Sequence, residues 1–598
     1  MPPLSKRWRL RPPVDAQAVA ALTHDRCPVE LATLLVQRGV DTPAQANLFF
    51  RPSREQLHDP FLMKDMDLAV DRIERALGDA ERIMIYGDYD VDGTTSVALV
   101  YGFLRGLVRS KEDLHHHIPD RYAEGYGIST FGIDRAASLG VTLIIALDCG
   151  IKSVDKVAYA ASKGIDMIIC DHHLPGDTLP EAVAVLDPKR ADCPYPFKEL
   201  SGCGIGFKLM QALAQNNDIP FTELEPQLDL VAISIACDIV PVNGENRALS
   251  HLGLQRLNNG SPRPGLKAML DMSNFTRALT ISDLVFVIGP RINAAGRIEH
   301  GQQAVELLLS TDAKEAANIG ARIDRNNSQR QELDKETTLQ ALEQIANEAA
   351  GSDPWSTVVF HPNWHKGVIG IVASRLIESH YRPTVVLTES NGKVSGSARS
   401  VKGFDLYEAI NACSDLLDQF GGHTFAAGLT METVNVAAFR RRFEEVVRAR
   451  MDESLRRPTE EVDLELDLDH ITDAFVRNIQ RMAPFGPHNM RPLFVARGVV
   501  DDGRARIVGD DHLKMDLRMS GGSRSFPAIA FRMGQRMDLV KSGAPFSILY
   551  SIEENEWQGR RSVQLNIKDI KAGTEPFDEE GTFLSSLDAE RTAVEPLP

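Results

Sequence analysis

The sequence predicts an α/β protein with a parallel sheet, a long helix, a second and smaller α/β domain, and a β-rich C-terminal domain. Three observations support this prediction. Short apolar runs alternate with helix-length segments between residues 60 and 305, a pattern typical of parallel strands buried on both faces. Residues 321–350 contain neither Gly nor Pro and are rich in helix-forming residues. Short strand-like segments separated by turn residues follow Pro458.

The composition is that of a folded protein without membrane segments. The chain has 598 residues, of which 43% are hydrophobic and 25% are charged, so we expect several domains. No apolar run approaches the ~20 residues that cross a bilayer, and no apolar stretch follows the basic N-terminal segment, as it would in a secretory signal. Seven cysteines without a CxxC pair favour small core residues in a reducing compartment. We therefore expect a cytoplasmic protein.

The strongest functional signal is the segment YGDYDVDG at residues 86–93. It follows an apolar run that predicts a buried strand, and it carries Asp88, Asp90 and Asp92. Alternate residues of an extended chain point the same way, so these three carboxylates should project together. Clustered carboxylates repel one another unless a cation neutralises them. The segment therefore predicts a divalent metal site; taken alone, it could also be an acidic turn.

Three later segments repeat the pattern of an apolar run that ends in an acid. VTLIIALDCG ends at Asp148, IDMIICDHH ends at Asp171-His172-His173, and LVAISIACDIV ends at Asp238. We interpret each run as a strand of the same parallel sheet. Ligands of such sheets bind at the carboxyl ends of the strands, near a reversal of strand order. The four acidic segments should therefore meet in one crevice and form a metal centre.

The remaining segments can be assigned in chain order. VDLELDL at 462–468 alternates strictly and predicts one strand with a wet face. Further short strands, from RPLFVARGVV to RSVQLNIKDI, fit a small barrel such as an OB-fold, which commonly binds single-stranded nucleic acid. We expect an N-terminal accessory segment (residues 1–50), a catalytic domain (51–310), a connecting helix (311–350), a second α/β domain (351–455), the barrel (456–572) and an acidic, mobile tail (573–598).

These motifs resemble those of a known superfamily. GDYDVDG, Asp148, the DHH at 171–173 and Asp238 resemble the DHH phosphoesterases, and NWHKGVIGIVASRL, GSARS and GGHTFAAG resemble their DHHA1 companion domain. PDRYAEGYGI, SGCGIGF, GPRINAAGR and the β-rich C-terminal region narrow the resemblance to the RecJ family. It covers roughly residues 50–570. One turn, PFGPHNMRPLF, departs from the family pattern PFGxGNPxP at His488 and Met490.

The resemblance implies a two-metal site that holds Mn²⁺ or Mg²⁺. Asp90 and Asp148 would serve one ion, and the other ion would be held by Asp92, Asp148, His172 and Asp238. Asp88 would be a further ligand or an acid behind the ligands. His173 would contact the scissile phosphate or the attacking water. Hard oxygen and imidazole ligands suit these metals, and Mn²⁺ tolerates histidine better than Mg²⁺ does.

The resemblance also implies a substrate, single-stranded DNA with a 5′ end that is degraded 5′ to 3′ in recombination and repair. The residues expected to contact it are Arg121, Arg291, Asn293, Arg297, Ser397, Arg399 and His423. The net charge of −17 neither supports nor excludes this substrate, because phosphate binding depends on local clusters of Lys and Arg. A helicase and a single-strand-binding protein are the implied partners, and no membrane is expected.

Other functions share parts of this pattern. A DHH/DHHA1 phosphodiesterase acting on short oligonucleotides or cyclic dinucleotides would have the same metal site, but such enzymes are about half as long and lack the barrel. A non-enzymatic replication scaffold would have lost metal ligands, whereas all the expected ligands are present. A manganese-dependent pyrophosphatase would not need the barrel. The chain has no GxxxxGK[ST] pattern, so ATP-driven unwinding is not expected.

Overall fold

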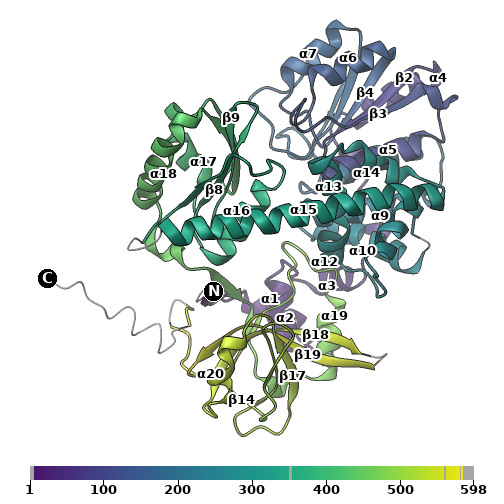
Figure 1. Ribbon diagram of the computed structural model, residues 1–598. Helices are drawn as coiled ribbons and strands as arrows, with labels where there is room; N and C mark the ends of the chain where they lie inside the picture. The colour runs from purple at the N-terminus through teal and green to yellow at the C-terminus, as the bar shows by residue number, and fades with distance from the viewer. Residues whose placement is uncertain (1–5, 261, 349–352, 558–559, 579–580, 584–598) are drawn as a thin grey trace. The chain divides into compact units, whose positions relative to one another are not determined.

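The computed structural model describes residues 6–260, 262–348, 353–557, 560–578 and 581–583 (Figure 1). The chain divides into two compact units. We call residues 48–331 together with 484–490 the parallel-sheet unit, and residues 1–47, 332–483 and 491–598 the mixed-sheet unit.

The parallel-sheet unit is built on five strands in the order β3-β2-β4-β5-β6. These are β2 (Arg82–Gly87), β3 (Leu114–His117), β4 (Val141–Leu147), β5 (Asp166–Cys170) and β6 (Ala184–Leu186). All neighbouring strands are parallel. Because β3 and β4 lie on opposite sides of β2, the strand order reverses at β2. This reversal places the expected ligand crevice at the carboxyl ends of β2 and β4.

Both faces of this sheet are covered, which explains the continuous apolar runs. Ile83 and Ile85 of β2 belong to one core, together with α4 (Met66–Gly78) and α5 (Val91–Leu104). Met84 and Tyr86 belong to another, together with α6 (Thr130–Ser138) and α7 (Val154–Ser162). Alternate residues of one strand thus fill two cores, as expected for a buried parallel strand.

The rest of this unit is helical, and it corrects one prediction. The run that ends at Asp238 is not a strand: it forms α9 (Leu228–Cys237), with Asp238 as the C-terminal cap. An apolar run of this length fits a helix buried on all sides as well as it fits a strand, and α9 is buried from Leu228 to Ala236. The neighbouring helices are α8 (Gly202–Asn216), α10 (Gly244–Asn259), α11 (Pro264–Met272), α12 (Ile281–Asp283), α13 (Gly289–Ile298) and α14 (Gln302–Leu309), with a π-helix at Leu284–Ile288 before α13.

The predicted long helix is α15 (Ala313–Glu348). It has 36 residues, which corresponds to roughly 54 Å at 1.5 Å per residue. Its first part belongs to the parallel-sheet unit and its last part to the mixed-sheet unit. No helix in the described ranges is both long and apolar enough to span a membrane.

The mixed-sheet unit contains a five-stranded sheet in the order β10-β11-β9-β8-β7. Its strands are β7 (Thr357–Phe360), β8 (Thr384–Ser390), β9 (Lys393–Arg399), β10 (Gln419–His423) and β11 (Ala426–Met431), and its helices are α16 (Ile369–Ser379), α17 (Leu406–Asn411) and α18 (Val436–Arg450). β7 and β8 are parallel, whereas the other pairs are antiparallel. Because β7 is the last strand in the order given above, it lies at one edge of the sheet.

A second sheet of this unit, in the order β13-β14-β18-β19-β17-β16-β15, closes into a barrel because β14 also pairs with β16. Its strands are β13 (Leu464–Glu465), β14 (Phe494–Asp501), β15 (Arg506–Val508), β16 (His512–Met519), β17 (Phe526–Ala530), β18 (Phe546–Trp557) and β19 (Arg560–Ala572); α19 (Asp473–Arg481) and α20 (Met537–Lys541) accompany them. A closed barrel agrees with the predicted OB-like fold.

The segment VDLELDL does not form the single strand that its alternation predicts. It is divided between β12 (Thr459–Val462), which pairs with β1 (Arg7–Leu10), and β13, which joins the barrel. Asp463 lies at the break, and its side chain accepts a bond from the Leu493 amide and pairs with Arg38. These partners are distant in sequence, so alternation alone could not reveal the break.

The two ends of the chain also pack on the barrel. The N-terminal segment contains α1 (Ala16–Leu22), α2 (Val29–Val36) and α3 (Pro43–Phe50), and the last residues of α3 belong to the parallel-sheet unit. Phe583, from the segment expected to be mobile, is buried against Trp8 with ring centroids 4.8 Å apart. Residues 579–580 and 584–598 of that segment lie outside the described residues.

The turn at residues 484–490 belongs to the parallel-sheet unit, although its flanks belong to the other unit. The Val242 amide donates to the Pro487 carbonyl over 2.7 Å. His488, which stands where the family pattern has Gly, has φ +61°. This left-handed conformation explains the glycine of the pattern, because residues with a Cβ adopt it at a cost.

Candidate metal centre

The first group of acids surrounds the turn between β2 and α5. Asp88 follows β2 directly, and Asp90 caps α5, where its side chain accepts a bond from the Gly93 amide over 3.1 Å. A Cβ at Gly93 would collide with the backbone of Asp88, so only glycine permits so tight a turn. The turn brings Asp88, Asp90 and Asp92 to the carboxyl edge of the sheet, as the sequence predicts.

Asp92 is buried and held by three donors. The amides of Gly202 and Cys203, in the first turn of α8, donate to its two oxygens over 2.7 and 2.8 Å. The hydroxyl of Ser234, in α9, donates over 2.7 Å. Hydrogen bonds from helix N-terminal amides stabilise an ionised carboxylate. No local sequence pattern predicts this support, because its donors lie more than a hundred positions away in the chain.

The remaining expected ligands converge on His172, which follows β5. Its Nε2 atom lies 3.2 Å from Oδ1 of Asp148, 3.5 Å from Oδ2 of Asp238 and 3.8 Å from Oδ2 of Asp92. Asp148 follows β4 and has φ +59°. Asp88, Asp90 and Asp148 form a second group whose ligand atoms lie within 4.8 Å of one another. Asp148 is therefore the carboxylate that joins the two groups.

The charges of this cluster call for a cation. Burial, and then the neighbouring Asp90, raise the pKa of Asp88 to about 8. Burial, and then Asp92, raise the pKa values of Asp148 and Asp238 well above their usual range. Oδ1 of Asp88 and Nδ1 of His172 are buried without a hydrogen-bond partner in the described part of the chain. Oxygen and imidazole donors that lack partners fit Mn²⁺ or Mg²⁺.

His173 lies beside this cluster and is oriented by Asp171. Its Nδ1 atom is 2.7 Å from Oδ1 of Asp171, and its Nε2 atom is 3.3 Å from the hydroxyl of Tyr126. Asp171 also accepts bonds from the amides of Ile151 and His172. Burial alone would raise the pKa of Asp171, but the ring of His173 and the amides of Ile151 and His173 lower it to about 2. Asp171 thus fixes the orientation of the His173 ring.

The arginines expected to bind the substrate end have different surroundings. The guanidinium of Arg121 lies over the ring of Tyr89, 4.4 Å from its centroid. Burial raises the pKa values of Asp88 and Asp90, and the charge of Arg121 opposes part of that rise. Arg291 donates to Asp324 over 3.0 Å and to the Val287 carbonyl over 2.8 Å. Asn293 and Arg297 lie on the same helix, α13. Arg121 is thus close to the carboxylates, whereas Arg291 already has an acidic partner.

The other expected contacts lie in the mixed-sheet unit. Ser397 and Arg399 are on β9, where Nη1 of Arg399 donates to the Ser397 hydroxyl over 3.1 Å. His423 ends β10 and is exposed; its register partner is Ala426 of β11, which also pairs with Arg399. These three residues therefore gather at one end of this sheet, while the metal ligands all belong to the parallel-sheet unit.

One further acid at a strand end was missed. Asp187 follows β6, is completely buried, and has one carboxylate oxygen without a partner in the described residues. Burial raises its pKa to about 7. The segment AVAVLDP has the same pattern of an apolar run followed by an acid, so the signal was present. The strand β6 has only three residues, so the run before Asp187 is a weak strand signal.

Comparisons with known proteins agree with this arrangement. Family models described as "DHH family, N-terminal domain", "DHHA1 domain" and "RecJ OB domain" match residues 82–235, 354–449 and 462–569. The single-stranded-DNA-specific exonuclease RecJ of Bacillus subtilis is 39% identical over 94% of this chain and 70% of the relative. The chain belongs to the RecJ family. RecJ of Escherichia coli is 34% identical over 85% of this chain and 90% of the relative.

Solved RecJ structures share the fold. Crystal structures of Thermus thermophilus RecJ in complex with Mn²⁺ and with Mg²⁺ match with TM-scores of 0.79 and 0.74, at 28% and 27% identity. Both matches cover 96% of this chain and about four-fifths of the RecJ chain. The metals in those structures are the two that the donor set described above fits.

Proposed function

We propose that this protein is a metal-dependent exonuclease that degrades single-stranded DNA from the 5′ end. The observation that carries the proposal is a set of three overlapping groups of metal-ligating side chains within a chain of the RecJ family. The groups are linked by Asp148 and His172: Asp88-Asp90-Asp148, Asp148-His172-His173 and Asp92-His172-Asp238. A separate barrel in the same chain supports a polymeric substrate over a dinucleotide, because a small substrate would not need it.

The residues that would hold the metals follow from these groups. Asp90 and Asp148, with Asp88 beside them, would hold one ion. The second ion would be held by Asp92, Asp148, His172 and Asp238. When bound, two such cations activate a water molecule for attack on the phosphate and stabilise the oxygen that leaves.

The neighbouring residues of the chain position and orient the reacting groups. Gly202, Cys203 and Ser234 hold the carboxylate of Asp92 in place. Asp171 fixes the ring of His173 through Nδ1, and Nε2 of the ring would exchange its contact with the Tyr126 hydroxyl for one with a phosphate oxygen or the attacking water. Hydrogen bonds that orient a catalytic histidine in this way contribute to the rate without touching the substrate.

End recognition and strand capture would involve the other expected residues. Arg121 would bind the terminal 5′ phosphate, because a guanidinium matches phosphate geometry and Arg121 is close to the metal carboxylates. Arg291, Asn293 and Arg297 of α13, and Ser397, Arg399 and His423 of the mixed-sheet unit, would contact the following nucleotides. The barrel would bind the single-stranded DNA. The domain limits would be those expected from the sequence.

The cellular setting is proposed on family membership alone. We propose a cytoplasmic enzyme of recombination and repair that works with a helicase and a single-strand-binding protein. The duplex would have to be opened by such a partner, because the sequence has no pattern for ATP binding by a phosphate-binding loop.

Digestion of end-labelled DNA tests this function. Single and double strands labelled at the 5′ or the 3′ end are incubated with Mn²⁺, with Mg²⁺ and with a chelator. We expect mononucleotides from the 5′ label at once, loss of the 3′ label only at the end, and no reaction with the chelator. Equal digestion of duplex and single strand, or early release of the 3′ label, would overturn the proposal.

A further inference from the structure

The side chain of Asn246, near the start of α10, lies between two segments that border the metal centre. It is completely buried. Its Nδ2 atom donates to the carbonyl of Glu199 over 2.5 Å and to the carbonyl of Pro241 over 3.0 Å. Because both partners are carbonyl oxygens, the atom that faces them is the amide nitrogen and not the amide oxygen. One side chain thus ties together two separate segments of the chain.

The first of these segments leads into the helix that holds Asp92. Glu199 lies shortly before Ser201, which is the N-terminal cap of α8. The next residue, Gly202, donates its amide to the carboxylate of Asp92 over 2.7 Å. The bond from Asn246 to Glu199 therefore anchors the chain just before the amide that orients this carboxylate.

The second segment leads away from Asp238. Asp238 caps the C-terminus of α9, and its amide donates to the Ser234 carbonyl over 2.9 Å. The next residue, Ile239, has φ +62°, a conformation that is strained for a β-branched residue. Ile239 is also 67% exposed, so packing of its side chain does not keep it in this conformation.

The strained conformation of Ile239 therefore depends on fixed points further along the chain. These include the bond from Asn246 to the Pro241 carbonyl and the bond from the Val242 amide to the Pro487 carbonyl. Strained residues persist only where the surrounding structure holds them. Loss of the Asn246 bond would let this segment relax and would change the surroundings of the metal ligand that precedes it.

Packing does not explain an asparagine at this position. Oδ1 of Asn246 is buried without a partner in the described part of the chain, and an unpaired buried acceptor lowers stability. A leucine of similar size would fill the same space without leaving that atom unpaired. Among the described residues, no other group donates to the carbonyls of Glu199 or Pro241. The contribution of the side chain is therefore its two bonds from Nδ2.

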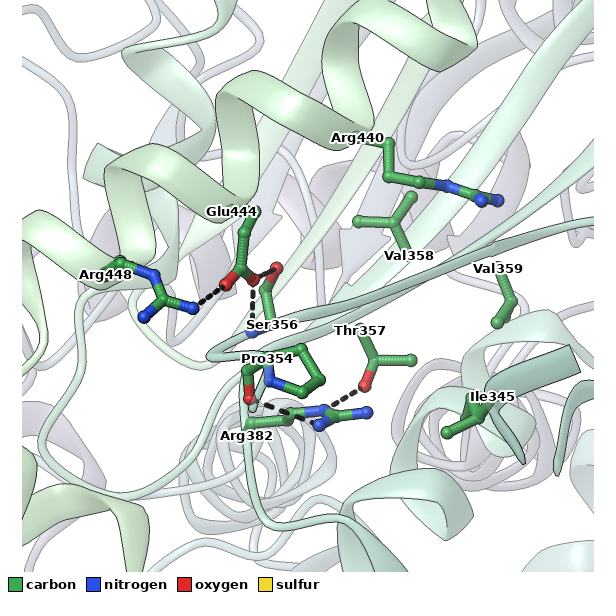
Figure 2. Close-up of a pocket in the computed structure, with 10 residues that line it drawn as sticks. All are labelled: Ile345, Pro354, Ser356, Thr357, Val358, Val359, Arg382, Arg440, Glu444 and Arg448. Atoms are coloured by element: carbon green, nitrogen blue, oxygen red, sulfur yellow. Dashed lines mark hydrogen bonds and ion pairs between the residues drawn. The ribbon is translucent and has the colours of Figure 1, made fainter. Parts of the chain in front are cut away.

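A side chain of the mixed-sheet unit makes a similar connection, in a unit that holds none of the proposed metal ligands. Glu444 of α18 accepts bonds from the amide and the hydroxyl of Ser356 over 2.8 and 2.6 Å, and so joins α18 to the start of β7 (Figure 2). This connection stabilises the packing of one helix on one strand. The connection made by Asn246 differs, because both of its partners adjoin residues that form or orient the metal centre.

We propose that Asn246 is a positioning residue for the metal centre. It fixes the start of α8 against the segment that follows α9, and thereby holds Asp92 and Asp238 in the arrangement that a shared ion needs. This inference rests on the proposed function, because it assumes the ion assigned above to the ligands around His172. Residues that orient metal ligands from behind affect the metal affinity strongly, although they do not touch the ion.

Binding of Mn²⁺ to the full chain, measured by calorimetry, tests the proposal. Asn246→Leu removes both bonds and keeps the approximate volume of the side chain. We expect one ion to bind as in the unaltered protein and the other to bind at least about tenfold more weakly. At limiting Mn²⁺, kcat for single-stranded DNA should fall by a similar factor, with KM for DNA unchanged, and saturating Mn²⁺ should restore kcat. A general loss of structure would not spare one ion or be reversed by added metal.

Asn258 provides a matched control on the same helix. Its side chain donates to the Leu279 carbonyl over 3.0 Å and accepts a bond from the Leu279 amide over 2.7 Å, in a loop that carries none of the metal ligands. Asn258→Leu, and Ser356→Ala in the mixed-sheet unit, should leave the affinity for both ions unchanged. Melting temperatures show whether each variant folds. Asn246→Ala also removes both bonds, and it should show the same selective loss if Asn246→Leu does not fold.

Hydrogen exchange of the metal-free protein adds a readout that depends on neither metal nor activity. We expect faster exchange at residues 200–203 and 238–243 in Asn246→Leu, and unchanged exchange at both segments in Asn258→Leu. Unchanged exchange in Asn246→Leu, unchanged binding of both ions, or equal losses in the two leucine variants would each overturn the proposal. If the unaltered protein binds two ions and digests DNA while the Asn246 variants behave like it, this inference fails alone. If the unaltered protein binds no pair of ions, the proposed function fails with it.

Discussion

The backbone amide of Gly202 donates a hydrogen bond to Oδ2 of Asp92 over 2.7 Å. The same glycine lies against Asp148: a Cβ added to it would be 2.7 Å from the Cβ of Asp148 and 3.0 Å from Oδ1. The first turn of α8 therefore orients one carboxylate of the metal centre and packs directly on another. No side chain fits at Gly202 without displacing Asp148.

The first prediction concerns this close approach. Gly202→Ala should push Asp148 away from His172 and lower the rate of hydrolysis roughly a hundredfold, because small displacements in a catalytic site have effects of this size. Mn²⁺ affinity, measured by calorimetry, should also fall. Gly204→Ala on the same helix is the control, because its added Cβ meets neighbours at 3.4 Å or more. Equal behaviour of the two variants would contradict the account.

The second prediction concerns the orientation of His173. Asp171→Asn should reduce kcat about ten- to hundredfold, because it removes a charge-assisted hydrogen bond worth about 1.5–3 kcal/mol. KM for single-stranded DNA and metal affinity should change little, since Asp171 contacts neither. Asp177→Asn, an exposed position in the following loop, is the control. A loss of metal binding in Asp171→Asn would instead make Asp171 a ligand.

The third prediction concerns the 5′ end. Arg121→Gln should lower the rate of digestion of 5′-phosphorylated strands about ten- to hundredfold. It should lower the rate of digestion of 5′-hydroxyl strands much less. The comparison of the two substrates serves as the internal control. Arg291→Gln should have a smaller selective effect, because Arg291 already bonds to Asp324. If Arg121→Gln lowers both rates equally, Arg121 binds the backbone and not the terminal phosphate.

The fourth prediction concerns a buried ion pair in the parallel-sheet unit. Lys208 donates to Glu245 over 2.9 Å and to the His58 carbonyl over 2.5 Å, and both members of the pair are fully buried. Lys208→Met should lower the free energy of unfolding by about 3–5 kcal/mol, because it leaves Glu245 charged and buried without its partner.

Denaturant unfolding of the full chain, followed by circular dichroism, measures the change in the free energy of unfolding of the parallel-sheet unit. Lys267→Met breaks the exposed pair with Asp271 and should change the stability by less than about 1 kcal/mol. A small effect for Lys208→Met would mean that Glu245 accepts a proton or reaches water when its partner is lost.

The sequence predicted the strand ends well because a short rule governs them. A buried parallel strand is a continuous apolar run, and the acid at its end faces the crevice, so Asp88, Asp148 and His172 could be placed together. The rule could not separate a buried strand from a buried helix, which is why Asp238 was assigned to a strand. The support of Asp92 by Gly202 and Ser234 depends on packing between distant helices, and no local pattern encodes it.

The most direct test of the account is Asp148→Asn, because Asp148 joins the two groups of ligands. Asparagine matches aspartate in shape and tolerates the left-handed backbone found here, so the variant should fold with an unchanged circular dichroism spectrum. Digestion of 5′-phosphorylated single-stranded DNA with Mn²⁺, together with the stoichiometry of Mn²⁺ binding, is the measurement. The account predicts that hydrolysis is abolished and that fewer than two ions bind. Substantial hydrolysis, or two ions bound as in the unaltered protein, would contradict it.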